Sequence, residues 1–119
     1  MSEASDTSGI PSMTAADALA QVVAGEFVLV DVREPHEWEA GRSPEALNLP
    51  MSQLGERVAE VPTDHRLAIV CHLGSRSARV TAALIGAGFD AVNVEGGMVA
   101  WVSAGGRIMK DGPGEPTVD

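Results

Sequence analysis

A single cysteine, Cys71, opens a short glycine-containing loop (residues 71–77) that follows the apolar run 67–70. The run predicts a buried strand, and the residues after the loop have a helical pattern. A sulfur at the start of a helix faces N–H groups without intrahelical partners and the positive end of the helix dipole. This environment favours the thiolate, the reactive form of cysteine. We therefore expect Cys71 to be a nucleophile.

The composition limits what kind of protein this is. With 119 residues, 45% of them hydrophobic, the chain suits one globular domain. One cysteine excludes an intramolecular disulfide, no Cys/His spacing resembles a zinc site, and we expect neither a metal nor another cofactor. No apolar run is long enough to span a membrane, and the N-terminus does not resemble a signal peptide, so we expect a cytoplasmic protein. The net charge of −9 argues against nucleic acid or an anionic membrane as partner.

The acids are unevenly spread. Although the chain has 17 of them, none of the 25 residues between Asp64 and Asp90 is Asp or Glu. The same stretch carries Arg66, Arg76 and Arg79. Two interpretations remain open at this point. A buried strand and a small-residue helix exclude charge in any case, or the stretch forms a locally positive pocket for a small anion.

The elements alternate along the chain. We expect strands at residues 27–32, 46–50, 67–70 and 91–94, and helices at residues 15–23, from Pro35, and at residues 53–60, 76–87 and 98–104. Thr14 and Ser52 are the expected caps of the first and third helices, and Gly88 is expected to end the fourth. Alternation of this kind predicts an α/β fold with a central parallel sheet and helices on both faces. Ligands of such folds bind at the carboxyl ends of the strands, where the Cys71 loop begins.

The ends of the chain differ in composition from the middle. Residues 1–12 are polar and predicted to be disordered, and residues 110–119 are rich in Gly, Pro and acids and predicted to be a loose tail. The domain itself is expected to span residues 13–109. We expect it to be a monomer.

Three stretches carry a family resemblance. Residues 30–34 (Val-Asp-Val-Arg-Glu), followed by residues 46–50 (Ala-Leu-Asn-Leu-Pro), form the first, the Cys71 loop the second, and residues 95–101 (Glu-Gly-Gly-Met-Val-Ala-Trp) the third. In this order and spacing, the chain resembles a single-domain rhodanese, a thiosulfate sulfurtransferase-like protein, over roughly residues 13–108. It departs from the family where residues 42–46 read Arg-Ser-Pro-Glu-Ala in place of His-Ile-Pro-Gly-Ala, and where His72 replaces the frequent Arg. The first departure concerns the wall near the site, and the second removes a fixed charge beside the sulfur.

The resemblance implies sulfur transfer in two half-reactions. The Cys71 thiolate attacks a small anionic sulfur donor such as thiosulfate, and the persulfide then gives its outer sulfur to a thiol, cyanide or a protein acceptor. The resemblance also implies that the loop amides hold the persulfide; these belong to His72, Leu73, Gly74, Ser75 and Arg76. Phosphatases and arsenate reductases of the same fold carry one more loop residue than the six from Cys71 to Arg76, so they are the least favoured alternative. The more favoured alternative is a persulfide carrier or binding module with little turnover of its own.

The sequence suggests roles for two arginines near the site. Arg76 either steers an anionic donor or stabilises the loop by forming an ion pair with an acid such as Glu34 or Asp31. Both hypotheses remain open. Asp31 and Arg33 are expected to form an internal ion pair that supports the end of the strand. We expect them to be structural rather than catalytic.

The other loop residues are assigned minor parts. Ser77 is expected to be a helix-capping hydroxyl that supports the site rather than a reactant. Gly74 is expected to permit a backbone conformation that other residues avoid. His72 is expected to point away from the sulfur, and Arg79 to be solvated at the surface.

Overall fold

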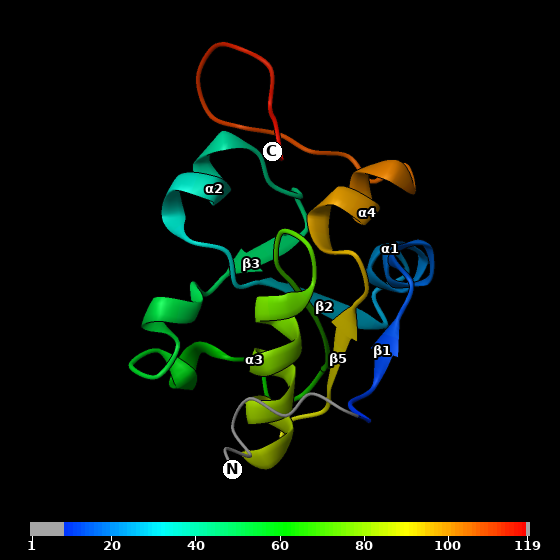
Figure 1. Ribbon diagram of the computed structural model, residues 1–119, viewed down its shortest axis with the longest axis vertical. Coiled ribbons are helices and arrows are strands. Elements are labelled where there is room, and N and C mark those ends of the chain that lie inside the picture. Colours follow the sequence, from blue (N-terminus) through cyan, green and yellow to red (C-terminus); the bar gives the residue numbers. More distant parts are fainter. Residues whose placement is uncertain (1–8, 119) are drawn as a thin grey trace.

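Five parallel strands form one sheet in the computed structural model, which describes residues 9–118 (Figure 1). The strand order is β1-β5-β4-β2-β3. The strands are β1 (Ser12–Met13), β2 (Phe27–Asp31), β3 (Ala46–Asn48), β4 (Arg66–Val70) and β5 (Ala91–Val94). The helices are α1 (Ala15–Val23), α2 (Pro35–Ala40), α3 (Ser75–Gly86) and α4 (Gly97–Ser103), with two 3₁₀ turns, η2 (Met51–Gln53) and η3 (Val58–Glu60). The predicted α/β fold with a central parallel sheet is confirmed.

The sheet has a separate apolar core on each face. Side chains of α1 and α4, among them the fully buried Trp101, pack on one face against Leu29 and Val70. Side chains of α3 pack on the other face, where Val80 and Leu84 meet Ile69. Figure 1 shows α1 and α4 grouped together and α3 lying apart from them. The near-continuous burial of β2, β4 and β5 follows, since both faces of these strands are covered.

Several short-range sequence signals have the expected geometry. The Thr14 hydroxyl caps α1 by accepting a hydrogen bond from the Asp17 amide at 3.1 Å. At the end of α3, Gly88 has a φ of +94°, and the Phe89 amide donates back to the Leu84 carbonyl at 2.9 Å. These caps fix where the flanking helices begin and end.

The helix predicted at residues 53–60 is wrong. The segment forms the two 3₁₀ turns η2 and η3, with Gly55 between them, where a glycine lowers the stability of a continuous helix. Ser52 therefore caps no α-helix, and its amide and hydroxyl donate to the Glu34 carboxylate instead. Helical spacing predicts that Val80, Ala83, Leu84 and Ala87 form the buried face of α3, and the structure differs. Ala83 and Ala87 are exposed, and the face turned to the sheet consists of Ser77, Val80, Thr81 and Leu84.

Both ends of the described chain are attached to the domain. Ser12, expected in the disordered segment 1–12, lies in the edge strand β1, which pairs with β5. Residues 1–8 lie outside the described residues. In the tail predicted to be loose from residue 110, the Thr117 amide donates to the Ala40 carbonyl at 2.8 Å. Just before it, Arg42 and Met109 form an antiparallel bridge that ties this segment to the domain.

The parallel register brings three loops together at one end of the sheet. These loops follow β2, β4 and β5, whose carboxyl ends are adjacent because β4 lies between the other two. The Cys71 loop is the central one. Among residues 9–118 there is no helix with the length and apolarity that a membrane crossing requires.

Candidate active site

The loop that begins at Cys71 owes its shape to two glycines. Gly74, the residue before α3, has a φ of +110°, a conformation that other residues rarely adopt. Gly97, at the start of α4, lies directly against the loop, because a Cβ there would be 2.3 Å from the His72 carbonyl oxygen. The Met98 amide donates to the Cys71 carbonyl at 2.8 Å. The cysteine loop is therefore held by main-chain contacts from the loop after β5.

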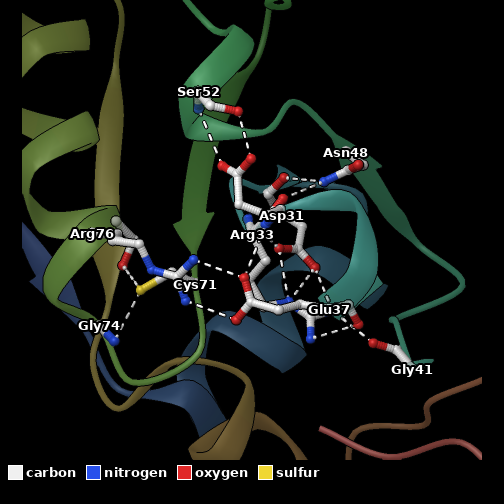
Figure 2. Close-up of polar contacts among 11 residues, drawn as sticks. Asp31, Arg33, Glu37, Gly41, Asn48, Ser52, Cys71, Gly74 and Arg76 are labelled. Atoms are coloured by element: carbon white, nitrogen blue, oxygen red, sulfur yellow. Dashed lines mark hydrogen bonds and ion pairs between the residues drawn. The ribbon is translucent and has the colours of Figure 1, made fainter. Parts of the chain in front are cut away.

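Hydrogen-bond donors converge on the Cys71 sulfur. The Gly74 amide nitrogen lies 3.1 Å from Sγ (Figure 2). The Ser77 hydroxyl oxygen lies 3.3 Å from Sγ. The expected capping role of Ser77 is wrong, since α3 begins at Ser75 after Gly74 and the Ser77 side chain turns inward from the first turn. Ser77 faces the sulfur because it lies on the buried side of that turn.

These contacts act on the ionisation of Cys71. Burial raises the pKa of the Cys71 thiol, but hydrogen bonds from the Ser77 hydroxyl and from the amides of Ser77, Gly74 and Leu73 outweigh it. The net result is a pKa below the ordinary value for a thiol. The thiolate is thus favoured by fixed donors, as the position at a helix start predicts.

The sulfur is enclosed. Cys71 is only 1% exposed, whereas Leu73 at the tip of the loop is 63% exposed. The amides of His72, Ser75 and Arg76 make no hydrogen bond to Sγ within the described part of the chain. Those of Ser75 and Arg76 belong to the first turn of α3, where N–H groups lack intrahelical partners. The Ser75 and Arg76 amides are therefore donors that a group attached to Sγ could use.

Arg76 pairs with Glu37, and with neither Glu34 nor Asp31 as the sequence suggested. Its guanidinium donates to both carboxylate oxygens of Glu37, at 2.8 and 2.9 Å (Figure 2). The hydrogen bond from Arg76 is the main reason that the pKa of Glu37 falls from 4.5 to about 2. Glu37 also accepts from the Glu34 amide at 3.0 Å, in the first turn of α2. Glu37 thus holds the cysteine loop to α2 and offsets the charge of Arg76.

A buried ion pair lies behind Glu37. Arg33, 1% exposed, donates to the fully buried carboxylate of Asp31 at 2.8 Å, as the sequence predicted. The same guanidinium donates to the Gly41 carbonyl at 2.7 Å and to the Glu37 carbonyl at 3.4 Å. Asn48 on β3 donates to the carbonyls of Asp31 and Arg33. This network fixes the β2–α2 loop that carries Glu37, and none of its members contacts Sγ.

The residues at the family departures do not reach the sulfur. Arg42 stacks over Trp38 at 5.1 Å from the ring centroid and pairs with Asp111 at 3.0 Å. It therefore ties the C-terminal segment to α2. The His72 ring makes no hydrogen bond to Sγ among residues 9–118, and Arg79 is exposed.

Two site residues were missed from the sequence. Glu37 was detectable, because an acid three residues after Glu34 at a helix start is typical of a capping box. Asn93 lies on the face of β5 that is turned to α3, and its carboxamide oxygen is 2.6 Å from the Ser77 hydroxyl. A polar residue within an otherwise apolar strand was the only available signal for Asn93.

The remainder of the described chain offers no comparable centre. Two surface hollows of about 230 and 320 Å³ lie near the amino ends of the strands, one beside His65 and Phe89 and the other beside Phe27 and Arg66. Neither is lined by a residue of the cysteine loop. Across residues 9–118 no cluster of three or more His, Cys, Asp or Glu side chains is placed to hold a metal ion.

Comparison with known proteins gives a consistent result. The family described as rhodanese-like domain matches residues 14–104. A sulfurtransferase of Allochromatium vinosum is 39% identical over 85 residues, which cover 71% of this chain and 79% of that protein. A thiosulfate sulfurtransferase of Pseudomonas syringae is 36% identical over 75 residues, 62% of this chain and 71% of that protein. The crystal structure of a rhodanese-related protein from Thermoplasma volcanium superposes with a TM-score of 0.77 at 32% identity, covering 83% of this chain and 97% of that one.

Proposed function

This chain belongs to the rhodanese-like domain family, whose relatives named above are sulfurtransferases, and from that premise we propose that it transfers sulfur through a Cys71 persulfide. The donor is thiosulfate or a similar sulfane sulfur compound, and the acceptor is a thiophile such as a thiol, cyanide or a protein. The observation that carries the proposal is the convergence of the Gly74 amide and the Ser77 hydroxyl on one enclosed sulfur.

The first half-reaction loads the cysteine. The Cys71 thiolate attacks the outer sulfur of thiosulfate, a new S–S bond forms, and the old S–S bond breaks as sulfite leaves with the electron pair. No separate base is required, because the donors around Sγ already lower the pKa of the thiol. The negative charge then resides on the outer sulfur of the persulfide.

The second half-reaction depends on holding that charge. The outer sulfur lies about 2 Å beyond Sγ, given the length of an S–S bond. The first-turn amides of α3, at Ser75 and Arg76, are fixed donors without helical partners that could hold it. An acceptor nucleophile then attacks the outer sulfur, and the Cys71 thiolate leaves. The cycle is covalent catalysis of ping-pong type.

A second candidate is a persulfide carrier with slow turnover of thiosulfate. Two observations favour it over a dedicated thiosulfate enzyme. Glu37 neutralises Arg76, the charged side chain of the loop, so little positive charge remains to attract a dianion. Cys71 is 1% exposed, so a free donor reaches Sγ only when the loop opens. A protein partner that carries a persulfide could drive this opening by binding.

A phosphatase or arsenate reductase activity is less favoured. From Cys71 to Arg76 the loop has six residues. The family resemblance implies that phosphatases and arsenate reductases of this fold have one more loop residue, which makes room for a tetrahedral oxyanion. A tetrahedral group also needs donors on several oxygens, and the pairing of Arg76 with Glu37 removes its most suitable cation.

Mass spectrometry of the intact protein tests the proposal. After incubation with thiosulfate, the reduced wild type should gain one sulfur atom, about 32 Da, and Cys71→Ser should gain none. An unmodified wild type after exposure to thiosulfate, to a polysulfide and to a persulfidated protein would overturn sulfur transfer at Cys71. Uptake from the persulfidated protein with slow uptake from thiosulfate identifies a carrier, whereas rapid uptake from thiosulfate eliminates it. Hydrolysis of an aryl phosphate that is lost in Cys71→Ser would instead support the phosphatase.

A further inference from the structure

A short polar chain is buried behind the reactive sulfur. The Ser77 hydroxyl oxygen lies 3.3 Å from Cys71 Sγ on one side and 2.6 Å from the Asn93 carboxamide oxygen on the other. Ser77 is fully buried and Asn93 is 8% exposed. The three residues come from three elements, the end of β4, the first turn of α3 and the middle of β5. Packing of α3 on the sheet therefore aligns them.

Counting hydrogens shows what this arrangement can accommodate. A serine hydroxyl has one hydrogen to donate, and here two acceptors face it. When that hydrogen points to the Asn93 oxygen, the closer acceptor at 2.6 Å, a lone pair of Ser77 faces Sγ, and the donation to Sγ that helps to lower the pKa of Cys71 is lost. A neutral thiol fits this arrangement, because its S–H can donate to Ser77. A thiolate does not, because it needs the Ser77 hydrogen for itself.

Rotation of the Asn93 carboxamide ends the competition between its oxygen and the thiolate for the Ser77 hydrogen. A half-turn of the carboxamide exchanges its oxygen and nitrogen without any change of shape. The Asn93 nitrogen then donates to Ser77, and the Ser77 hydroxyl donates to the sulfur. In the present orientation that nitrogen lies 3.5 Å from the Gly74 carbonyl, the outer limit of a hydrogen bond, so the rotation gives up one weak contact and places the Asn93 oxygen opposite that carbonyl.

We propose that Asn93 is a positioning residue whose carboxamide orientation sets the direction of the hydrogen-bond chain through Ser77 to Cys71. One direction matches the thiol and the other matches the thiolate that starts sulfur transfer. Asn93 does not touch the reacting sulfur, and acts only through Ser77. The inference rests on the proposed function in one respect, that the Cys71 thiolate is the nucleophile.

The charges around the sulfur do not obscure this effect. Arg76 on α3 and its partner Glu37 on α2 are charged side chains at the loop, with Glu34 at the start of α2 beyond them. His72, directly after Cys71, is a further titratable side chain, and its ring makes no hydrogen bond to Sγ among the described residues. Neither β5 nor α4 contains an ionisable residue. A substitution of Asn93 therefore changes the hydrogen-bond chain without removing a charge.

The midpoint of the pH profile of Cys71 alkylation by iodoacetamide reports the pKa of the thiol in the full-length reduced protein, whereas the absolute rate also depends on access to the enclosed sulfur. Asn93→Asp keeps the shape and, once ionised, can only accept, so it should raise the pKa of Cys71 both through Ser77 and through its own charge and slow alkylation roughly tenfold at neutral pH; only the first of these effects disappears in the Ser77→Ala background. Ser77→Ala alone should slow alkylation similarly. Thr81→Val is the matched control, because it removes a buried hydroxyl one turn later that donates to the Ser77 carbonyl and does not face Sγ. It should leave the alkylation profile unchanged.

A double-mutant cycle decides whether Asn93 acts through Ser77. Asn93→Val, an apolar residue suited to a strand, removes the competing acceptor and leaves the Ser77 hydrogen for Sγ, so it should lower the pKa of Cys71 and shift the alkylation profile to lower pH, yet change nothing in the Ser77→Ala background. Additive effects in the cycle, or an unchanged profile for Asn93→Asp, would overturn the inference. Should Asn93→Val fail to fold, Asn93→Ala takes its place in the cycle. Alkylation needs no sulfur donor, so failure of the persulfide test and failure of this inference are separate results.

Discussion

Two polar networks hold the cysteine loop, and they differ in the kind of group they use. Behind the sulfur, Ser77 and Asn93 form a neutral chain with one hydroxyl hydrogen between two acceptors. In front of it, Arg76 is bound to Glu37, which belongs to the segment fixed by Arg33. The neutral chain touches Sγ, whereas the hydrogen bonds of the charged network stop at the loop that encloses it.

The difference follows from what each kind of group costs when buried. An unpaired buried charge is strongly destabilising, so a charged network has one favourable arrangement and resists change. A hydroxyl and a carboxamide can reverse their hydrogen bonds without burying a charge. The charged network is thus suited to hold the loop in one position. The neutral chain is suited to contact a sulfur that changes between thiol and thiolate.

Removing the buried carboxylate of the charged network should have the largest effect on folding. Asp31→Ala leaves Arg33 buried without its ion partner, so we expect the free energy of unfolding to fall by about 3–5 kcal/mol. Urea denaturation measures this loss. Asp90→Ala, which breaks the exposed pair with Arg66, is the control and should change stability little. Equal losses in the two variants would show that the buried pair is not a special support.

A smaller loss is expected for Glu37→Gln. The substitution keeps the size of the side chain but gives up the charge-assisted bonds to Arg76, so stability should fall by about 1–3 kcal/mol at neutral pH. The hydrogen bond from Arg76, which is the main reason that the pKa of Glu37 falls from 4.5 to about 2, is the interaction that this substitution weakens. Denaturation of the wild type and the variant in parallel provides the difference.

The pH dependence of that difference identifies its origin. The pKa of Glu37 is lowered by folding, so its contribution is complete above pH 4.5 and is lost as the pH falls toward 2. The stability gap between wild type and Glu37→Gln should therefore be constant near neutrality and close in acid. A gap that stays the same from neutral pH to strongly acidic pH would contradict an ionic origin.

The smallest effect should come from the tip of the loop. Leu73 is 63% exposed, and it is its amide, not its side chain, that acts on the pKa of Cys71. Leu73→Ala should leave both the unfolding midpoint and the alkylation profile of Cys71 nearly unchanged. A clear shift of the profile would mean that the side chain shields the sulfur, and that the two networks are not the only control on it.

Local patterns were enough to predict most of the fold. The strand, loop and helix around Cys71, the Thr14 cap and the turn at Gly88 each depend on a few neighbouring residues. The helix at residues 53–60 failed because the apolar spacing was given more weight than Gly55. The two-residue strand β1 has too few residues for any periodicity, and only its pairing with β5 defines it.

The candidate site was predicted as far as the chain neighbours of Cys71. The partner of Arg76 was not, since Glu37 is 39 residues away and several acids lie in the same segment. Ser77 was assigned as a cap because the start of α3 could be placed only to within a residue or two. Asn93 depends on how α3 lies across β5, and this is a property of tertiary packing that no local pattern encodes.

The contact between Gly97 and the backbone of the cysteine loop links the chemistry to the order of synthesis. The loop leaves the ribosome before Gly97 and Met98, the residues that press against His72 and bind the Cys71 carbonyl. Until they emerge, the loop lacks the main-chain contacts of that segment, so the amides that act on Sγ are less firmly held. Full reactivity therefore arises only after the segment that follows β5 has been made and has packed against the loop.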